Sequence, residues 1–201
     1  GPVTRVNDIQ TVRLLTEDFD LIVTPKRSFF TNTRNIKTKG GISMSFRKTF
    51  VCLARSRKYG GCCIAGKTAS PSGYGNWIRP TGTNPGGALI ERETCLDDGS
   101  TAALLDLVTV HIQEKDEEVA YQAENYRICR GIPWKKEGTV HYGKIGELAD
   151  KPETLWKNNY SSGAGMNDFV PVSMLGGTAQ SLYLIRPFAL KLFAEPPRGP
   201  G

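Results

Sequence analysis

The chain has 201 residues, of which 39% are hydrophobic and 23% charged, a balance typical of a globular protein with one large or two small domains. No apolar run approaches the roughly 20 residues of a membrane-spanning helix, and the N-terminus lacks the apolar core of a signal peptide, so we expect a cytoplasmic protein without a membrane segment. The five cysteines have neither disulfide-type nor zinc-type spacing, which indicates free thiols in a reducing compartment and predicts no metal or other cofactor.

Residues 1–43 are expected to form an N-terminal extension or accessory segment. Its first two residues, Gly1 and Pro2, have the composition of a tag scar, and Phe19–Val23 predicts one strand. The segment then becomes polar and ends at a pair of glycines. It fits an arm, a swapped strand or the ordinary first hairpin of the main domain, and the sequence does not separate these alternatives.

From Met44 onward the pattern predicts short strands separated by turns. The clearest strand lies within Leu104–Ile112, where apolar and polar residues alternate. A short helix is predicted over Lys151–Lys157, because Pro152 falls in its first turn. The remaining predicted strands are Thr49–Ala54, Cys62–Ala65, Trp77–Arg79, Tyr126–Cys129, Ser181–Ile185 and Ala189–Ala194.

The fold class predicted from this pattern is all-β with minor helix. The chain contains 22 glycines and 12 prolines, which favours frequent turns over long helices. Small barrels of OB type suit such a pattern because they close their sheet edges. We therefore predict two OB-like small barrels, over residues 44–115 and 116–195, followed by a flexible tail at 196–201. An SH3-like, PUA-like or sandwich fold would leave similar marks.

The charge distribution is the most informative property of the chain. Residues 21–90 contain no Asp or Glu but twelve Lys and Arg, whereas residues 91–201 carry sixteen acidic and twelve basic side chains. Such a one-sided field attracts polyanions, of which nucleic acid is the commonest. A solvated basic surface is the alternative explanation, although the interleaved aromatic residues and glycines favour a binding role.

Gly61–Thr68 matches the regular expression of a nucleoside triphosphatase phosphate loop. That motif binds phosphate only when a buried strand precedes it and a helix begins at its lysine. Here the preceding segment, residues 55–60, is basic and polar, and Pro71, Gly73 and Gly75 would end a helix within a turn. We therefore interpret the match as accidental and predict that Cys62–Ala65 is itself a buried strand. A cysteine nucleophile there is disfavoured for the same reason.

Several blocks of the sequence resemble a known family. The run Phe50–Lys67, followed by Asn76–Pro80, looks like the opening of the dual OB-containing domain family. Later blocks that also resemble the family are Leu104–Val108, Tyr121–Asn125, Trp134, Leu155–Trp156 and Ser181–Ile185. The resemblance extends from about Met44 to Ala194. The resemblance implies two OB-like barrels and a role related to nucleic acid or nucleotides. It also implies a gene neighbourhood of bacterial conflict with phage or nucleic-acid modification, without an established reaction. Cys62 stands where a further basic residue is expected.

The candidate contacts to nucleic acid or a nucleotide form three groups. The first is the turn that follows the strand at Thr49–Ala54, where cations and flexible backbone are suited to phosphate. The second combines a tryptophan ring, on which a base could stack, with guanidinium and ammonium groups. The alternative role for this group is structural, with the tryptophan in the core beside an ion pair. The third has amide and carboxylate groups suited to base edges or to capping a barrel. The groups are, in order, Arg55, Ser56, Arg57 and Lys58; Lys67, Trp77 and Arg79; and Gln122, Glu124 and Asn125.

The function predicted from these features is binding of nucleic acid, in single-stranded form, as a sensor or targeting module of a prokaryotic defence or modification system. We expect a protein partner encoded in the same gene neighbourhood, and we expect no association with a membrane. One alternative is an enzyme that acts on a nucleotide or modified base in a cleft between barrels, with Asp106, Glu124 and Asn125 as candidates. A second alternative is an adaptor whose basic stretch meets an acidic protein. The sequence predicts no catalytic residue.

Overall fold

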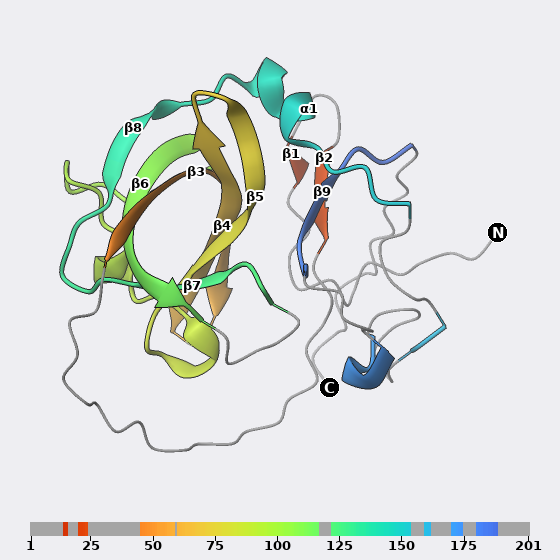
Figure 1. The fold of residues 1–201 in the computed structure, drawn as a ribbon, viewed down its shortest axis with the longest axis horizontal. Coiled ribbons are helices and arrows are strands. Elements are labelled where there is room, and N and C mark those ends of the chain that lie inside the picture. Colours follow the sequence, from red (N-terminus) through yellow and green to blue (C-terminus); the bar gives the residue numbers. More distant parts are fainter. Residues whose placement is uncertain are drawn as a thin grey trace, which may run out of the picture.

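The computed structural model describes the backbone at residues 14–15, 20–23, 45–58, 60–116, 122–153, 159–161, 170–174 and 180–188. Strands dominate this part of the chain, which confirms the all-β prediction (Figure 1). The strands are β1 (Leu14–Leu15), β2 (Asp20–Val23), β3 (Phe46–Lys58), β4 (Gly61–Ser70), β5 (Gly73–Thr81), β6 (Asp106–Lys115), β7 (Asn125–Ile128), β8 (Lys135–Thr139) and β9 (Tyr183–Ile185). The helical elements are α1 (Ile145–Leu148) and the 3-10 turns η2 (Pro85–Gly87), η3 (Glu91–Glu93), η4 (Tyr142–Lys144) and η5 (Val172–Met174).

Five strands close into a barrel. β3 pairs with β4, β4 with β5, β5 with β7, β7 with β6, and β6 returns to β3. All these neighbours are antiparallel except β5 and β7, which are parallel. β8 pairs with β6 and extends the sheet. The strand order is that of an OB-type Greek-key barrel, so the predicted OB-like fold is confirmed for this barrel.

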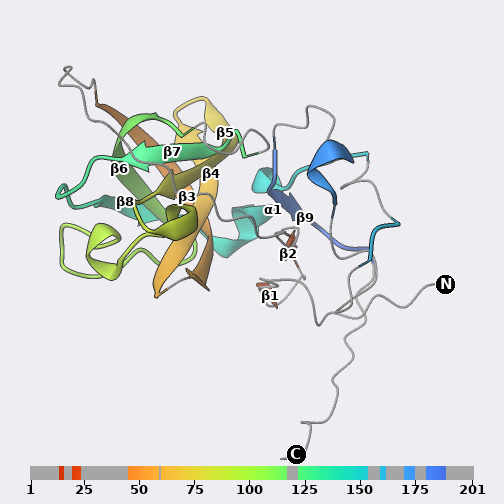
Figure 2. The ribbon, with the colours of Figure 1, turned by 90° about the horizontal axis from the view of Figure 1, so that it is seen from below.

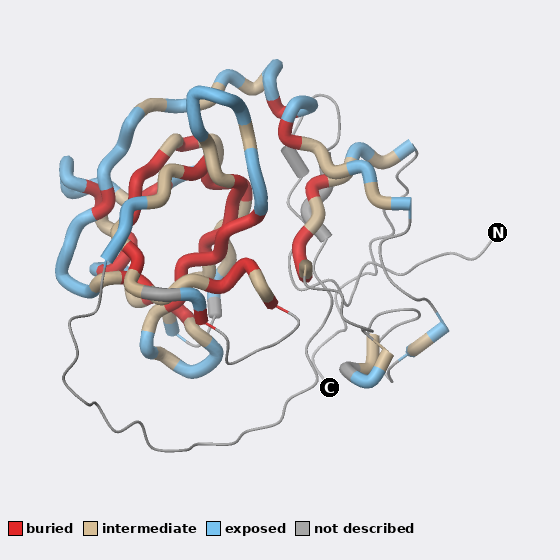
Figure 3. The backbone as a smooth tube through the Cα atoms, viewed as in Figure 1, coloured by how far each residue is buried: buried red, intermediate tan, exposed pale blue. Residues whose placement is uncertain are grey.

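The barrel interior is filled by apolar side chains that alternate along the strands. Phe50 and Cys52 of β3 point inward, and the Phe50 ring meets Trp134 edge to face at a centroid distance of 5.9 Å. Buried residues accordingly recur along the barrel strands, where the tube is red in Figure 3. This interior cluster comprises Phe50, Cys52, Ile64, Ile78, Leu89, Leu96, Ala102, Val108, Val110, Ile112, Ile128 and Trp134.

A second apolar cluster lies on the outside of the barrel. The outward residues of β3, β4 and β5 pack against α1 and β9, which lie beside these strands (Figure 2). Its buried members are Val51, Leu53, Ala65, Trp77, Ile145, Leu148, Leu182 and Leu184. The outer face of β4 and β5 is therefore covered by the later part of the chain.

The barrel extends beyond the predicted domain boundary at residues 115 and 116. Residues 44–115 supply only β3, β4, β5 and β6, and the fifth strand that closes the barrel is β7, at Asn125–Ile128. β8 then continues the same sheet to Thr139. The difference has a simple cause, because a sheet of four such strands cannot close without the fifth. The second barrel stays a prediction, as much of 140–195 lies outside the described residues.

The predicted strand near Phe19 forms as β2. It pairs with β1 and with β9, in the register Leu21 to Ile185, so residues of the N-terminal segment join a sheet with residues of the C-terminal part. The division of residues 1–43 from the rest stays a prediction. The predicted strand at Ala189–Ala194 and the tail at 196–201 lie outside the described residues.

The strand predicted from Leu104 and the helix predicted over Lys151–Lys157 both differ from the structure. β6 begins at Asp106 rather than Leu104, because Leu105 has φ of 67° and breaks the extended backbone. The helix predicted over Lys151–Lys157 is not helical at residues 151–153, and residues 154–158 lie outside the described part. The described α-helical turn is α1, just before that segment.

Candidate nucleic-acid interface

The turn between β3 and β4 holds the first group of predicted contacts. Residues Arg55–Gly61 (the basic turn) include the last four residues of β3, which pair with the first four of β4, and Gly60, whose φ of 74° suits glycine. Arg57 is exposed and forms no ion pair with any described residue. Barrels of this type use the loop between their first and second strands to contact ligands, and the basic turn occupies that position.

Arg55 is anchored, whereas Arg57 is free to reach solvent. The Arg55 Nη1 donates to Thr101 Oγ1 at 3.2 Å and to the Ala102 carbonyl at 3.5 Å, which ties the basic turn to the segment before β6. Ser56, between them, is half-buried, and only the backbone of Lys58 is described. The basic turn thus offers one hydrogen-bonded guanidinium, that of Arg55, and one exposed guanidinium, that of Arg57.

Cys62 lies across from Arg57 in the β3–β4 ladder. Burial raises the pKa of the Cys62 thiol, and the nearby Arg55 guanidinium offsets this effect only in part. A raised pKa keeps the sulfur protonated, and a protonated thiol is a poor nucleophile. Cys62 also packs against the interior cluster, as a small apolar residue does.

The second predicted group lies at the contact between the barrel and the later part of the chain. Trp77 is only 3% exposed and donates its indole Nε1–H to Asp150 Oδ2 at 3.0 Å. Lys67 Nζ reaches Asp150 Oδ1 at 2.6 Å, and the backbone N–H of Leu184 donates to Oδ2 at 2.8 Å. One carboxylate therefore joins β4, β5 and β9, and the Trp77 ring is covered in this structure.

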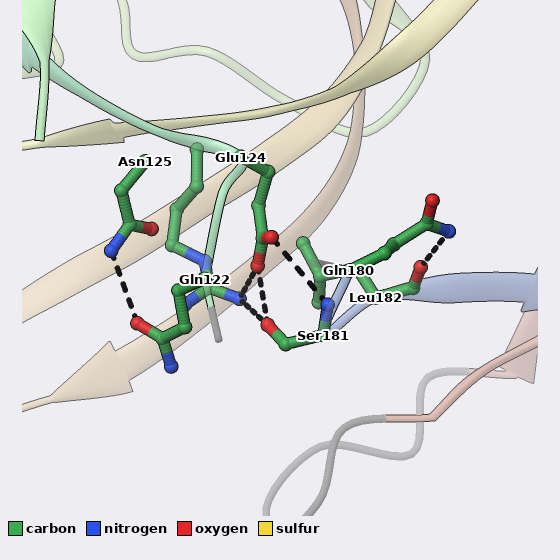
Figure 4. Close-up of polar contacts among 7 residues, drawn as sticks. Gln122, Glu124, Asn125, Gln180, Ser181 and Leu182 are labelled. Atoms are coloured by element: carbon green, nitrogen blue, oxygen red, sulfur yellow. Dashed lines mark hydrogen bonds and ion pairs between the residues drawn. The ribbon is translucent and has the colours of Figure 1, made fainter. Parts of the chain in front are cut away.

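Arg79, the third member of that group, forms a separate buried network. Its Nη2 donates to Glu124 Oε1 at 2.8 Å and to Ser181 Oγ at 2.9 Å. Ser181 in turn donates its hydroxyl to Glu124 (Figure 4). All three side chains are buried, so the charges of Arg79 and Glu124 compensate each other away from water.

The amide group of Asn125 lies next to this network. Asn125 is 5% exposed, and its Nδ2–H donates to Gln122 Oε1 at 3.1 Å. Figure 4 shows the two side chains and this hydrogen bond. The backbone N–H of Asn125 also donates to the Gln122 carbonyl, so the two residues form a turn that leads into β7. The Asn125 Oδ1 is buried and accepts no hydrogen bond from any residue that the structure describes.

The structure thus divides the ten predicted contacts into two places. Four lie at the basic turn, and six lie buried where the barrel meets the later part of the chain. The sequence missed the residues that complete the buried networks, Asp150 and Ser181. They contact residues 57 to 102 positions earlier in the chain, and no local pattern marks such distant partners.

The segment that matches the phosphate-loop expression is strand β4, which confirms the predicted strand. Ile64 and Ala65 are buried, whereas Cys62 and Cys63 are half-buried. Packing explains why glycine occupies both glycine positions of the motif. A Cβ on Gly66 would lie 2.8 Å from Phe50 Cδ2 and closer still to the Val51 carbonyl oxygen, while one on Gly61 would overlap the Leu89 carbonyl. Both glycines therefore allow backbone to approach closely, which is a structural use of the residue.

Asp106, a candidate of the enzyme alternative, lies elsewhere. Its carboxylate accepts from the Ala103 backbone N–H at 2.9 Å and from Thr139 Oγ1 at 3.2 Å, and it pairs with Lys136 Nζ at 2.6 Å. Burial raises the pKa of Asp106, but these partners outweigh that effect and hold it below its ordinary value of 3.8. The printed contacts join Asp106 to the start of β6 and to β8, and not to Glu124 or Asn125.

Two further properties concern metals and membranes. Among the described residues, no three His, Cys, Asp or Glu side chains gather as a metal site would require. The described helices are all too short to span a lipid bilayer.

Comparison with known protein families identifies a match. The family model of the dual OB-containing domain matches residues 48–200. Neither the curated proteins nor the solved structures contain a significant match. OB-type barrels bind oligonucleotides and oligosaccharides, and a dual OB domain indicates nucleic-acid binding at a general level.

Proposed function

This chain belongs to the dual OB-containing domain family, and from that premise we propose that it binds single-stranded nucleic acid through the basic turn. The observation that carries the proposal is the position of Arg57. It is exposed and unpaired among the described residues, at the loop that OB barrels use for ligands. Guanidinium groups and turn amides are suited to phosphate oxygens, which fix a strand without reading its sequence.

The covered outer face restricts where the strand can lie. α1 and β9 occupy the outer side of β4 and β5, so a ligand reaches the barrel at the basic turn and not across that face. Lys67, Trp77 and Arg79 would join the interface only if α1 and β9 moved away from the barrel. The same holds for Gln122, Glu124 and Asn125, which lie buried at that contact.

A titration against several nucleic acids tests the proposal. Affinity is measured for single-stranded DNA, single-stranded RNA, duplex DNA and free nucleotides at several salt concentrations. Single strands should bind best, and the logarithm of the affinity should fall by about 0.7 per log unit of salt for each phosphate neutralised. An affinity that does not change with salt concentration would contradict the proposal.

Charge reversal at the basic turn identifies the surface. Arg57→Glu should weaken binding to every sequence and lower the salt slope, and the triple change of Arg55, Arg57 and Lys58 to Glu should do so more strongly. Lys144→Glu is the matched control, because Lys144 is also exposed and changes the net charge equally, but lies in η4. Equal loss in both reversals would show a general charge effect and not a site.

We also propose the setting that the family resemblance implies. The chain would act in the cytoplasm as the sensing or targeting module of a prokaryotic defence or modification system, beside a protein encoded nearby. Co-expression with the products of adjacent genes, followed by purification, checks this. Failure of every such product to associate would leave nucleic-acid binding as the whole function.

One observation favours the enzyme alternative. The Asn125 Oδ1 is buried beside the Glu124–Arg79 pair and has no partner in the described part of the chain, so this atom can accept a further hydrogen bond. A nucleotide amine would satisfy it. Incubation with nucleotides and with modified single strands, followed by mass spectrometry, tests for turnover, and unchanged masses would exclude this alternative for the substrates tested.

A further inference from the structure

Two aromatic rings flank one lysine at the rim of the barrel. The Lys48 Nζ lies 5.8 Å from the centroid of the Phe46 ring and 5.4 Å from that of Tyr126. Phe46 is 42% exposed, and Tyr126 is half-buried against the interior cluster. The three side chains come from the beginnings of β3 and β7, away from the basic turn at the far end of β3.

The strand register explains why they meet. Phe46, Lys48 and Phe50 alternate along β3 and therefore point to the same side, on which Phe50 enters the barrel core. Tyr126 and Ile128 share a side of β7 in the same way. β6 lies between the two strands, because Ile112 pairs with both Phe46 and Ile128. Phe46, Lys48 and Tyr126 (the rim residues) therefore lie on the same faces of β3 and β7 as the core residues, at the open end of the barrel.

No carboxylate of the described residues neutralises the charge of Lys48. Lys48 forms no ion pair with any described residue, and the window 21–90 around it contains no acid. Its neighbours are instead the two rings, whose faces attract a cation. An exposed ring beside an unpaired cation combines a stacking face with a hydrogen-bond donor and a positive charge.

We propose that Phe46, Lys48 and Tyr126 form a subsite for one unpaired nucleobase, a proposal that rests on the function proposed above. The base stacks on the exposed face of Phe46, as bases stack on aromatic side chains in proteins that bind single strands. The Lys48 ammonium has only donors, so it pairs with a carbonyl oxygen of the base. Thymine, uracil, guanine and cytosine present such an oxygen, whereas adenine has only ring-nitrogen acceptors, and the subsite therefore discriminates against adenine.

Equilibrium titrations of oligo(dT) and oligo(dA) test the stacking part. Phe46→Leu keeps an apolar side chain but removes the ring, and it should lower affinity for both strands by about five- to hundredfold. Ile132→Ala is the matched control, because Ile132 is 43% exposed and lies outside the rim. A thermal unfolding curve of each variant checks that it is folded.

The lysine tests the preference. Lys48→Met keeps the aliphatic stem and removes the donor, so the ratio of oligo(dT) to oligo(dA) affinity should fall toward one. Lys48→Arg should retain most of that ratio, since the guanidinium also donates. Comparing ratios within each variant cancels the different self-stacking of the two strands.

Photo-crosslinking gives a readout that a purely structural role would not produce. A single strand containing 5-iodouracil should crosslink to Phe46 or Tyr126 in the wild-type protein, as mapped by mass spectrometry of the peptides. If the wild type binds with Arg57 dependence but Phe46→Leu binds equally well and crosslinks map elsewhere, the subsite is overturned and the proposed function stands. If the wild type shows no salt-dependent binding at all, the proposed function itself fails.

Discussion

The indole of Trp77 and the carboxylate of Asp150 join the barrel to the part of the chain that covers it. The Nε1–H of Trp77 donates to Asp150 Oδ2 at 3.0 Å across 73 residues of sequence. Asp150 also accepts from Lys67 and from the backbone of Leu184, next to the apolar contacts of α1 and β9. The outer face of an OB barrel that commonly binds ligand is here an internal contact.

Replacing Trp77 should affect folding. Trp77→Ala removes a ring that is 3% exposed and should lower the free energy of unfolding by about 3–5 kcal/mol. Trp77→Phe retains a ring but leaves Asp150 with one donor fewer, and should cost less. Urea unfolding of both variants measures these differences.

Nucleic-acid binding by the same variants decides between the two roles predicted for Trp77. If the ring stacks on a base, Trp77→Ala should lose about five- to hundredfold in affinity beyond any loss of folded protein, and Trp77→Phe should recover part of it. A destabilised Trp77→Ala that binds normally at low temperature would assign the ring to the core contact alone.

The sequence predicted the barrel fold better than it predicted the residues at which the barrel begins and ends. Alternating apolar residues marked the strand within Leu104–Ile112, because one of its faces lies in the barrel core. The strand at Thr49–Ala54 was marked instead by a continuous apolar run, because Phe50 and Cys52 face the interior cluster and Val51 and Leu53 face the outer one. β8 was missed, since its residues, Lys135–Thr139, are mostly exposed and carry no hydrophobic period. The boundary at residue 115 differed because closure depends on β7, and strand pairing between distant segments leaves no local mark.

The Lys67–Asp150 pair should show strong energetic coupling. Lys67→Met leaves Asp150 with two other donors, whereas Asp150→Asn leaves the Lys67 ammonium, 10% exposed, without its carboxylate. Asp150→Asn should therefore cost more, and breaking such a pair costs up to about 3–5 kcal/mol. The double variant should cost less than the sum of the two.

A double-mutant cycle in urea supplies the measurement. The expected coupling energy lies at about 0.5–3 kcal/mol, the range of contacting residues. Strictly additive effects would mean that the ion pair contributes nothing, and that Asp150 acts only through Trp77 and Leu184.

Acid should destabilise the fold in part through Asp106. Its pKa is lowered in the folded protein, although burial alone would raise it, because Lys136, Ala103 and Thr139 stabilise the charged form. A lowered folded-state pKa contributes stability above the unfolded-state pKa, and this contribution is lost as pH falls through the folded-state pKa. The loss should therefore occur below about pH 4.

Unfolding free energies between neutral pH and about pH 2.5 check this expectation. Asp106→Asn should be less stable than the wild type at neutral pH, and the difference between the two should shrink as the pH falls. Asp97→Asn is the control, because Asp97 is an exposed aspartate, and its curve should follow that of the wild type. A difference between Asp106→Asn and the wild type that stays constant with pH would contradict the role of the Asp106 charge.

The predicted contact residues illustrate why sequence places a site poorly. Arg79 and Glu124 have the residue types of a nucleotide site, and the same types form a buried structural ion pair. Which of the two occurs depends on Ser181, 102 residues beyond Arg79. Only the basic turn could be predicted and placed together, since its residues are adjacent in the chain.

The glycines of β4 provide the last prediction. Gly66→Ala would force a Cβ against the Val51 carbonyl and Phe50, so β3 and β4 would have to move apart. Its cost should lie at the upper end of the about 1–3 kcal/mol typical of overpacking. Gly60→Ala meets open space and suffers only the strain of a φ of 74°, about 1–2 kcal/mol, and it serves as the control.

Unfolding measurements on both variants, together with an assay of magnesium-dependent ATP hydrolysis, distinguish packing from phosphate binding. If Gly66 serves packing, Gly66→Ala loses more stability than Gly60→Ala, and Lys67→Ala leaves any ATP turnover at the level of the starting protein. A phosphate loop requires the opposite pattern, since its glycine and lysine act on the bound nucleotide. Robust hydrolysis that disappears in a folded Lys67→Ala would show that β4 rearranges to bind phosphate.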